Sequence, residues 1–247
     1  MLPRPLQLLR KTLALAQLGA LALKPGRCPT CGPTLMVKLA DDAISVRCIR
    51  CRASAIHMSI LQVLQGLYPD LSGLAAYEMS SRGPLFDYLR ARAGPFTCSE
   101  FFDDVLPGAF RGDIQCQDVQ ALTYGLASFD LCTSTEVFEH VPDDRKGFSE
   151  IRRVLRPGGR FVFTVPLTEN ATTVERAVLE GGAIRHLLEP EYHGDVIRGH
   201  GRVLCFRNYG LDIVDRLRES GFRDVRLVPA DRAGWWGFGT KVVVAEA

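Results

Sequence analysis

Residues 128–167 (SFDLCTSTEVFEHVPDDRKGFSEIRRVLRPGGRFVFTVPL) decide the fold of this chain. The apolar run at residues 129–134 is rich in strand formers. Asp143 and Asp144 then stand where a short carboxylate caps the first turn of a helix. The apolar residues that follow recur at spacings of three and four, which marks one face of a helix: Phe148, Ile151, Val154 and Leu155.

The same stretch ends in a second strand. Pro157, Gly158 and Gly159 end the helix and reverse the chain, and residues 160–166 form a near-continuous apolar strand. A strand, a helix and a strand with short links make a unit of a parallel sheet, in which ligands sit beyond the carboxyl ends of the strands. The residues expected at that edge are Thr133, Ser134, Thr135 and Glu136.

FDLCTSTEVFEHVPD followed by EIRRVLRPGGRFVFTVP resembles the fourth and fifth motifs of class I S-adenosylmethionine-dependent methyltransferases with a type 11-like domain. An ordinary strand–helix–strand crossover explains the Pro-Gly-Gly turn and the apolar strands. It does not explain why Glu136, Glu139 and His140 crowd the end of one strand. The resemblance implies a doubly wound, mostly parallel, seven-stranded α/β sheet of the Rossmann-like kind, with S-adenosylmethionine as the cofactor.

The composition is that of an ordinary soluble globular protein. The chain has 247 residues, 47% hydrophobic and 23% charged, which suits one domain of roughly 200 residues with a small appendage. A formal net charge of +2 gives no argument for binding nucleic acid or a membrane by bulk electrostatics. No apolar run reaches the ~18 residues that a membrane-spanning helix needs.

The N-terminal residues 1–26 are expected to form a helix. Arg4, Arg10 and Lys11 precede an apolar run at residues 13–23 that faintly resembles a signal peptide. Because Gln17 interrupts that run and cysteine pairs follow at once, we favour an amphipathic or buried helix. Four further cysteines are scattered and suggest no disulfide framework, so a reducing cytoplasm is the expected location.

Residues 27–53 hold two C-x2-C pairs that are sixteen residues apart: Cys28 and Cys31, then Cys48 and Cys51. Between the pairs, residues 35–39 and 44–46 alternate like a hairpin with Asp41 and Asp42 at its turn. Two cysteine turns joined by a hairpin can bring four thiolates to one Zn²⁺, so we predict a structural zinc ribbon. A redox pair and a site that has lost its metal are the alternatives. A helix at residues 54–72 then leads to the main domain, 73–247.

The resemblance places the first strand of the family at residues 74–79, its cofactor loop next and its first helix at residues 84–93. The residues predicted to bind the cofactor here are Glu78, Ser80, Ser81, Arg82 and Gly83. The family usually has an acidic residue followed by G-x-G-x-G. Because serine disfavours the positive φ angles that glycine allows, we expect the loop either to adopt another shape or to bind the cofactor weakly. Arg82 would pair with the carboxylate of the cofactor or remain a solvated charge.

Two further acids are assigned by the resemblance. Glu100, at the end of a strand within residues 94–104, would accept hydrogen bonds from the ribose hydroxyls, with Asp103 and Asp104 as runners-up. Asp118 would lie near the adenine amino group and Val119 beside the ring, although an aspartate here also suits the cap of a turn. The last two residues predicted to bind the cofactor are Thr133 and Ser134.

Residues 168–201 form an insertion at a position where this family commonly recognises its substrate. Residues 175–188 are expected to form a helix interrupted by Gly181 and Gly182. Tyr192 and His193 are the predicted substrate-binding residues, with a plain polar surface loop as the alternative. A helix at residues 209–221 and strands at residues 223–228 and 240–245 would complete the domain.

Methyl transfer from a sulfonium is a direct displacement, so alignment of the two partners supplies much of the rate. Where the acceptor must lose a proton, His140 and His193 are the candidate bases, because imidazole titrates near neutral pH. Glu136 is a further candidate and Glu139 a weaker one. As an alternative, His140 would cap the following helix.

The acceptor is expected to be an oxygen, nitrogen or carbon atom of a small molecule, sugar or lipid. The fourth strand lacks the Asn/Asp-Pro-Pro-aromatic motif of methylases that act on amino groups of adenine or glutamine. One alternative is an RNA methyltransferase whose Arg47, Arg50 and Arg52 contact phosphates, although this ribbon lacks exposed aromatic residues to stack bases. Another is a non-catalytic relative that kept the fold and lost cofactor binding.

Overall fold

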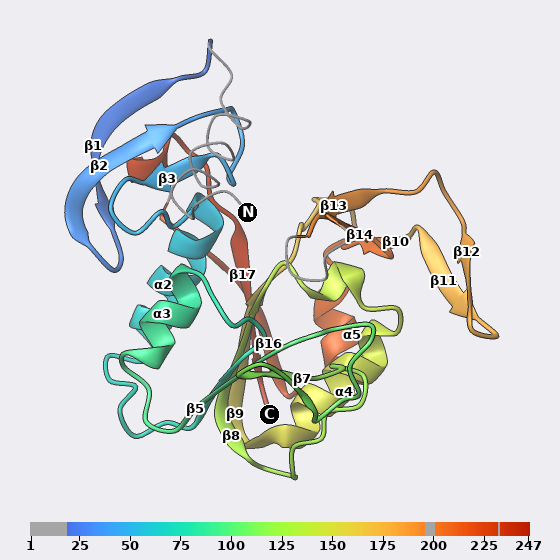
Figure 1. Ribbon diagram of the computed structural model, residues 1–247. Coiled ribbons are helices and arrows are strands. Elements are labelled where there is room, and N and C mark those ends of the chain that lie inside the picture. Colours follow the sequence, from blue (N-terminus) through green and yellow to red (C-terminus); the bar gives the residue numbers. More distant parts are fainter. Residues whose placement is uncertain (1–18, 196–200, 232) are drawn as a thin grey trace. The chain divides into compact units, whose positions relative to one another are not determined.

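Residues 19–195, 201–231 and 233–247 are described by the structure, a computed structural model (Figure 1). They divide into two units. The first comprises the described residues up to Leu67 together with Pro229–Thr240, and the second comprises Tyr68–Val228 and Lys241–Ala247. Within the described residues, no helix is long and apolar enough to cross a membrane.

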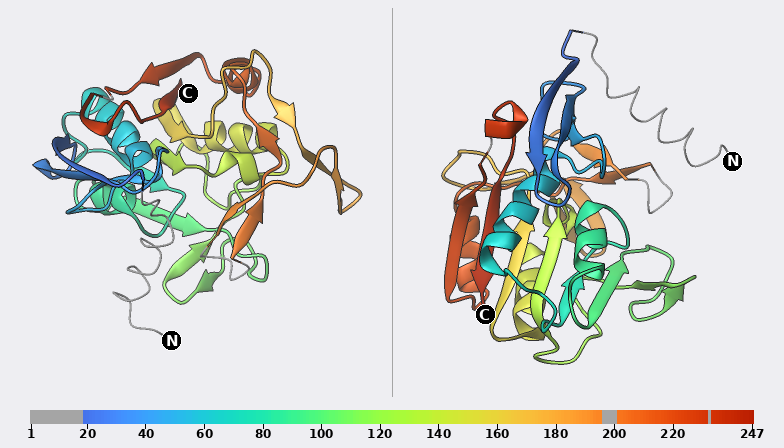
Figure 2. Two further views of the ribbon diagram at one scale, coloured as in Figure 1. Left: turned by 90° about the horizontal axis from the view of Figure 1, so that it is seen from above. Right: turned by 90° about the vertical axis from the view of Figure 1, so that its left-hand side faces the viewer.

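A single large sheet dominates the second unit. Within the described residues its eight strands lie in the order β16-β17-β9-β8-β4-β5-β7-β6. The strands are β4 (Ala76–Glu78), β5 (Phe96–Glu100), β6 (Phe110–Arg111), β7 (Ile114–Cys116), β8 (Phe129–Thr135), β9 (Leu155–Thr164), β16 (Asp224–Pro229) and β17 (Lys241–Glu246). The right-hand view of Figure 2 shows β16 and β17 in red at one edge and the green strands β6 and β7 at the other.

The strand pairing confirms a mostly parallel sheet. The pairs β4–β5, β4–β8, β5–β7 and β8–β9 are parallel, whereas β17 runs antiparallel to β9. The sheet has one strand more than the seven expected, because β6 adds a two-residue antiparallel strand beside β7. So short an edge strand has no pattern that a sequence could reveal.

Helices cover both faces of the sheet, with α3 (Pro84–Arg90) on one face and α4 (Asp144–Val154) and α5 (Ile213–Glu219) on the other (Figure 1). Asp143 caps α4 as expected, since its side chain accepts a hydrogen bond from the Lys146 amide at 3.0 Å. The core beneath α4 is aromatic. The rings of Phe138 and Phe148 stack with centroids 4.5 Å apart, and those of Phe161 and Phe163 stack at 4.1 Å.

The insertion is built of short strands, so the helix expected at residues 175–188 is wrong. It contains β10 (Val174–Glu175), β11 (Ala177–Glu180), β12 (Ala183–His186) and β13 (Tyr192–Gly194), and two more short strands follow directly after it, β14 (Arg202–Leu204) and β15 (Arg207–Asn208). Strands β11 and β12 pair antiparallel with Leu179 opposite Ile184. Gly181 and Gly182 have φ angles of 58° and 82°. Two such residues favour a tight hairpin turn, and that preference outweighs the helix-like spacing of the apolar side chains.

The first unit contains β1 (Ala22–Cys28), β2 (Gly32–Lys38), β3 (Val46–Cys48) and α2 (Ala55–Leu67). Strand β2 pairs antiparallel with β1 and β3, which confirms the hairpin between the two cysteine pairs. The helix expected over residues 1–26 is wrong from Ala22 onward. Alternate side chains of β1 are exposed and half-buried, as in a strand with one covered face. Residues 1–18 of that expectation lie outside the described residues.

The segment Pro229–Thr240 belongs to the first unit and not to the main domain to which the sequence assigned it. Trp235, 3% exposed, lies in a buried cluster with Met36, Val46 and Met58. Its indole nitrogen donates a hydrogen bond to the Arg27 carbonyl oxygen at 3.3 Å. Burial of this large apolar ring fixes the segment in the first unit.

We expect Phe148→Ala to lower the free energy of unfolding by about 3–5 kcal/mol, because it removes a fully buried ring that stacks on Phe138. Urea denaturation followed by far-ultraviolet circular dichroism measures the change. The matched control is Phe110→Ala on β6, which removes a ring that is 63% exposed and should cost less than about 0.5 kcal/mol. Equal losses in the two variants would contradict the core described here.

Candidate functional site

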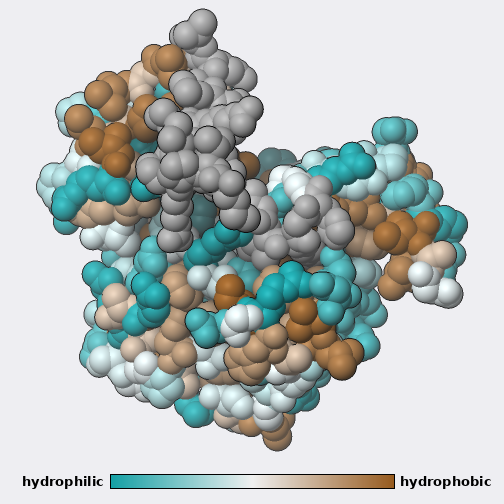
Figure 3. Space-filling view, in the orientation of Figure 1, coloured by the Kyte–Doolittle hydropathy of each residue, from teal (hydrophilic) through white to brown (hydrophobic). Residues whose placement is uncertain are grey.

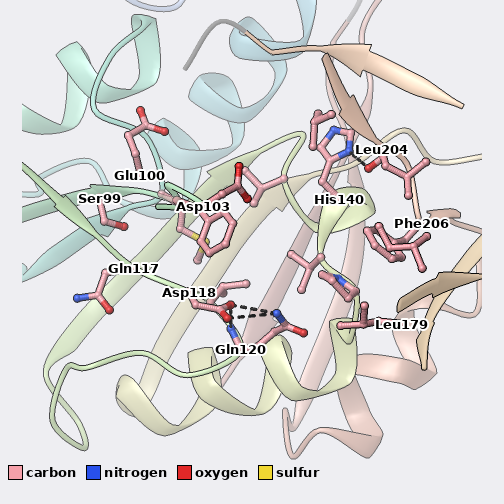
Figure 4. Close-up of a pocket in the computed structure, with 18 of the residues that line it drawn as sticks. Ser99, Glu100, Asp103, Gln117, Asp118, Gln120, His140, Leu179, Leu204 and Phe206 are labelled. Carbon is pink, nitrogen blue, oxygen red and sulfur yellow. Dashed lines mark hydrogen bonds between the residues drawn. The ribbon is translucent and has the colours of Figure 1, made fainter. Parts of the chain in front are cut away.

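Two adjoining cavities open at the carboxyl ends of β4, β5, β7 and β8, and Figure 4 shows the residues that line the larger one. Their volumes are about 310 Å³ and about 240 Å³. The larger is at the low end of the ~300–1,000 Å³ that is typical of small-molecule sites. The residues that line both are Met79, Glu100, Phe101, Val137, His140 and Val203.

The loop after β4 is held by a carboxylate. The Ser81 amide and hydroxyl both donate hydrogen bonds to Glu100 Oε1 at 2.8 Å, and the Ser80 hydroxyl lies 3.4 Å from the same atom. Within this loop only Gly83, with a φ of 105°, lies in the left-handed region. The loop therefore takes a shape that serine allows, in which hydrogen bonds replace the flexibility of the missing glycines.

Glu100 is 7% exposed and lines both cavities. Burial raises the pKa of this carboxyl above its ordinary value, while the bonds from Ser81 and the charge of Arg82 lower it in part. Of the two runners-up, Asp103 lines the larger cavity, whereas Asp104 pairs with Arg111 and lines neither. Glu100 is thus placed where two ligand-sized spaces meet.

Asp118 both caps a turn and lines a cavity, so it meets both of the expectations stated for it. Its Oδ1 accepts a hydrogen bond from the Gln120 amide at 2.9 Å, which is the turn cap, and the residue also lines the larger cavity (Figure 4). Val119 lines the same cavity, beside Gln117 and Gln120. The sequence analysis did not include the two glutamines among the candidate site residues. Their closeness to Asp118 in the chain is the sequence feature that could have indicated them.

Three residues predicted to bind the cofactor point elsewhere. The side chains of Thr133 and Ser134 are fully buried, and neither residue lines either of these two cavities. Thr133 donates a hydrogen bond to Glu78, which is also buried, and burial raises the pKa of Glu78 to about 8. A ligand in the smaller cavity would instead meet Thr135 and Glu136, which line it.

Glu136 has an unusual backbone for its position. Its φ of 54° is in the left-handed region, which costs about 1–2 kcal/mol for a residue with a Cβ atom. Its Oε1 is buried without a hydrogen-bond partner among the described residues. Burial, followed by the charge of Glu139, raises the pKa of Glu136 to about 8. Strain of this kind concentrates at functional sites.

A buried arginine fixes the loop that follows. Arg207 is 3% exposed and donates hydrogen bonds to the carbonyl oxygens of Phe138, Val141 and Pro142. Three carbonyls bound by one guanidinium leave the short helix Phe138–His140 (η1) little freedom. Nothing in the sequence marked Arg207 for this role.

The three candidate catalytic residues gather around Glu139. Glu139 Oε1 lies 3.5 Å from His140 Nε2 and 3.6 Å from His193 Nδ1, and the two imidazole rings meet edge to face at 4.9 Å. The nearby carboxylate of Glu139 is the main cause that raises the pKa of His193 above its ordinary value. His140 does not cap α4, since Asp143 does.

The predicted substrate residues separate. Tyr192 is 43% exposed, lies under the Arg202 guanidinium at 4.3 Å and lines neither cavity. His193 joins the cluster at Glu139, and the next residue, Gly194, lines the smaller cavity. The larger cavity also has apolar lining residues that were missed: Leu179 and Ile184 of the insertion, and Leu204 and Phe206 just after it.

Residues 82–163 match a protein-family model described as a methyltransferase domain. The fold agrees with a crystal structure of an S-adenosylmethionine-dependent methyltransferase from Mesorhizobium loti, with a TM-score of 0.50 and 17% identity over 76% of this chain and 98% of that one. The chain therefore carries a methyltransferase domain, and its fold is that of an S-adenosylmethionine-dependent methyltransferase.

Curated relatives of this methyltransferase match over shorter stretches. The ubiquinone biosynthesis O-methyltransferase of Coxiella burnetii is 38% identical over 50 residues, which is 20% of this chain and 21% of that protein. The phthiotriol/phenolphthiotriol dimycocerosates methyltransferase 1 of Mycobacterium ulcerans is 32% identical over 123 residues, 47% of this chain and 44% of that one. The chain thus spans about a fifth of the first relative and under half of the second.

The methyltransferase also brings its four N-terminal cysteines together. The sulfur atoms of Cys28, Cys31, Cys48 and Cys51 lie within 4.8 Å of one another, with Cys28 and Cys51 at 3.5 Å. A tetrahedral zinc ion with Zn–S bonds of ~2.3 Å places its sulfurs about 3.8 Å apart, so the group fits. The hydrogen bond from Cys51 lowers the pKa of Cys28 to about 4. Thiols this close share protons unless a cation replaces them.

The two cysteine turns repeat one backbone feature. Gly32 follows Cys31 with a φ of 70°, and Arg52 follows Cys51 with a φ of 62°. The nearby arginines brace these turns, since Arg50 donates a hydrogen bond to the Cys31 carbonyl oxygen at 3.0 Å and Arg47 to that of Arg52 at 3.4 Å. Arg52 in the second turn therefore adopts the left-handed conformation that Gly32 adopts easily in the first, and for a residue with a side chain this conformation is unfavourable.

This repeat yields a paired prediction. Gly32→Ala should lower the free energy of unfolding of the first unit by about 1 kcal/mol, and Arg52→Gly should raise it by a similar amount. Both tryptophans lie in this unit, so their fluorescence during denaturation of the zinc-loaded chain reports on it alone. Arg50→Gly, in the same turn but outside the left-handed region, is the control and should not stabilise. Stabilisation by both arginine variants would count against the argument.

Proposed function

We propose that this chain transfers a methyl group from S-adenosylmethionine to a small-molecule acceptor that has an apolar part. The observation that carries the proposal is the pair of cavities at the strand ends, with Glu100 on their shared wall. The methyltransferase domain and its fold support the same cofactor and the same edge of the sheet.

The lining residues suggest how the cofactor would be held. S-adenosylmethionine supplies an electrophilic methyl group on a sulfonium. Glu100, with Oε1 already bound by Ser81, would accept hydrogen bonds from the ribose hydroxyls. Asp118 and Val119 would meet the adenine in the larger cavity, and Arg82 would face the carboxylate end in the smaller one.

The insertion supports an acceptor with an apolar part. Leu179 and Ile184 on the β11–β12 hairpin line the larger cavity, although each is 50% exposed. Figure 3 shows apolar side chains on the hairpin, which projects at the right of the view. Large apolar side chains that stay half exposed beside a cavity mark a ligand-binding surface. The relatives named for ubiquinone biosynthesis and for phthiotriol dimycocerosates are consistent with such an acceptor.

The cluster at Glu139 supports an acceptor that loses a proton, such as a hydroxyl. As the acceptor oxygen bonds to the methyl carbon, the carbon–sulfur bond breaks and the acceptor proton must leave. His140 lines both cavities, and its Nε2 lies 3.5 Å from Glu139 Oε1, so its imidazole would take that proton and the carboxylate would stabilise the resulting charge.

The four clustered cysteines are proposed to hold a structural Zn²⁺. The test replaces zinc with Co²⁺ and measures the thiolate-to-cobalt charge-transfer absorption in the near ultraviolet. We expect one such cobalt per chain and the loss of the band in Cys48→Ser, because Cys48 is a fully buried member of the set. A chain that shows no such band, or a band that Cys48→Ser leaves unchanged, would rule the zinc module out.

Calorimetry with S-adenosylhomocysteine tests the proposed cofactor site. Glu100→Gln should weaken binding at least tenfold, because charged hydrogen bonds contribute about 1.5–3 kcal/mol. Asp104→Asn is the matched control, since Asp104 lies close by in the chain but lines neither cavity, and it should bind within twofold of the unsubstituted chain.

The same titration separates the rival functions. An unsubstituted chain that fails to bind at millimolar S-adenosylhomocysteine would favour a non-catalytic protein of this fold. Salt-dependent retention of RNA would favour the RNA methyltransferase, although Arg47 and Arg50 are already bound to backbone carbonyls.

A further inference from the structure

Glu139 is a buried carboxylate in an unusual state. The residue is 0% exposed, and neither of its side-chain oxygens accepts a hydrogen bond of normal geometry from the described residues. Burying such a group is costly unless it is paired or coordinates a metal. Two imidazoles of the described part of the chain approach its Oε1, those of His140 at 3.5 Å and His193 at 3.6 Å.

Both imidazoles are oriented from outside the cluster. The outer nitrogen of His140, Nδ1, lies 2.8 Å from the Leu204 carbonyl oxygen. The outer nitrogen of His193, Nε2, lies 3.2 Å from Glu191 Oε1. A carbonyl oxygen only accepts, so Nδ1 of His140 carries the proton, and Nε2 is the nitrogen that faces Glu139. Metal-binding histidines are held in this way, by a carbonyl or carboxylate on the other nitrogen.

The spacing suits an ion. The ligand atoms of Glu139, His140 and His193 lie within 4.8 Å of one another. A four-coordinate ion with bonds of ~2.0–2.1 Å to nitrogen and oxygen holds its ligand atoms about 3.3 Å apart. The observed 3.5 Å and 3.6 Å differ from that by only a few tenths of an ångström.

The three residues are also held in place. Glu139 and His140 lie on η1, in which Arg207 binds the Phe138 carbonyl oxygen, and the Glu139 carbonyl accepts a hydrogen bond from the Phe206 amide at 2.7 Å. His193 pairs with Val203 across strands β13 and β14. The ligands therefore come from two elements that backbone hydrogen bonds fix, which is what a preorganised metal site requires.

We propose that Glu139, His140 and His193 form a second metal site, which binds one first-row divalent cation. Two imidazoles and one carboxylate suit Zn²⁺, Co²⁺, Fe²⁺ or Ni²⁺ better than Mg²⁺ or Ca²⁺, which prefer oxygen ligands throughout. Three protein ligands leave positions for water or for an oxygen of a bound ligand. The site does not require the methyl transfer proposed above, and His140 places it on the wall of both cavities. While an ion is bound, His140 Nε2 is a ligand and cannot take the acceptor proton, so the proton acceptance proposed above applies to the metal-free chain.

An overlapping set, Glu191, His193 and Cys205, is a weaker candidate. The Cys205 thiol donates a hydrogen bond to the Arg207 carbonyl oxygen at 3.1 Å, and a metal ligand would have to be the thiolate. Glu191 already accepts from His193 and pairs with Arg176 at 3.2 Å. With these partners, Glu191 would orient His193 from outside the site at Glu139 and would not itself bind the ion.

The test is a titration of the full chain with Co²⁺ after its cysteines have been loaded with zinc. We expect one cobalt per chain, with visible absorption but without the thiolate-to-cobalt band that any exchange at the cysteines would produce. His193→Gln should weaken this binding at least tenfold, and so should Glu139→Gln. The matched control is His186→Gln, which changes an exposed histidine of β12 outside the cluster and should leave the affinity within twofold.

Two outcomes would overturn the proposal: no cobalt binding at millimolar concentration, or binding that both ligand variants leave unchanged. Glu139 would then be compensated by a protonated His193 alone. Because Glu139 is buried and its variant is at risk of misfolding, His193→Gln, at a half-buried position, keeps the test decisive. S-adenosylhomocysteine binding is measured on the same samples. If the chain binds S-adenosylhomocysteine but not cobalt, only the proposed metal site is contradicted. If it binds cobalt but not S-adenosylhomocysteine, only the proposed function is contradicted.

Discussion

The hydrogen bonds from Ser81 to Glu100 tie the end of β4 to the end of β5, and the cavity edge of the sheet depends on them. They compensate a carboxylate that burial would otherwise penalise. They also shape a loop in which only Gly83 adopts a left-handed conformation. The edge at which the family resemblance led us to expect several glycines is built here from one charge and two serines.

The central part of the fold was predictable because its signals are local. The helix capped by Asp143 and the apolar strands on either side each follow from periodicity and from turn chemistry in one short stretch. The insertion was not predictable in the same way. Its apolar side chains fit a helix as well as a hairpin, and only the turn at Gly181 and Gly182 decided between them.

The site was predictable only in part, for a related reason. Position at a strand end correctly brought Glu136 to a cavity, but it could not tell which side chains of β8 point outward, and Thr133 points into the sheet. Contacts between distant segments leave no pattern in one sequence. The approach of His193 to Glu139 is such a contact, and so is the binding of the Phe138 carbonyl by Arg207. They emerge only when the insertion folds back over the end of β8.

The return of Pro229–Thr240 to the cysteine-bearing unit affects how this protein can be divided. The chain passes between the two units after Leu67, after Val228 and again after Thr240. A single proteolytic nick at any one of these passages leaves the halves joined through the other two. A fragment that starts at Tyr68 would carry Trp235 without the residues that bury it. The cysteine-bearing unit is therefore made of two separate segments of the chain. Exchanging only the segment that ends at Leu67 for that of another protein would leave Pro229–Thr240 without its packing partners.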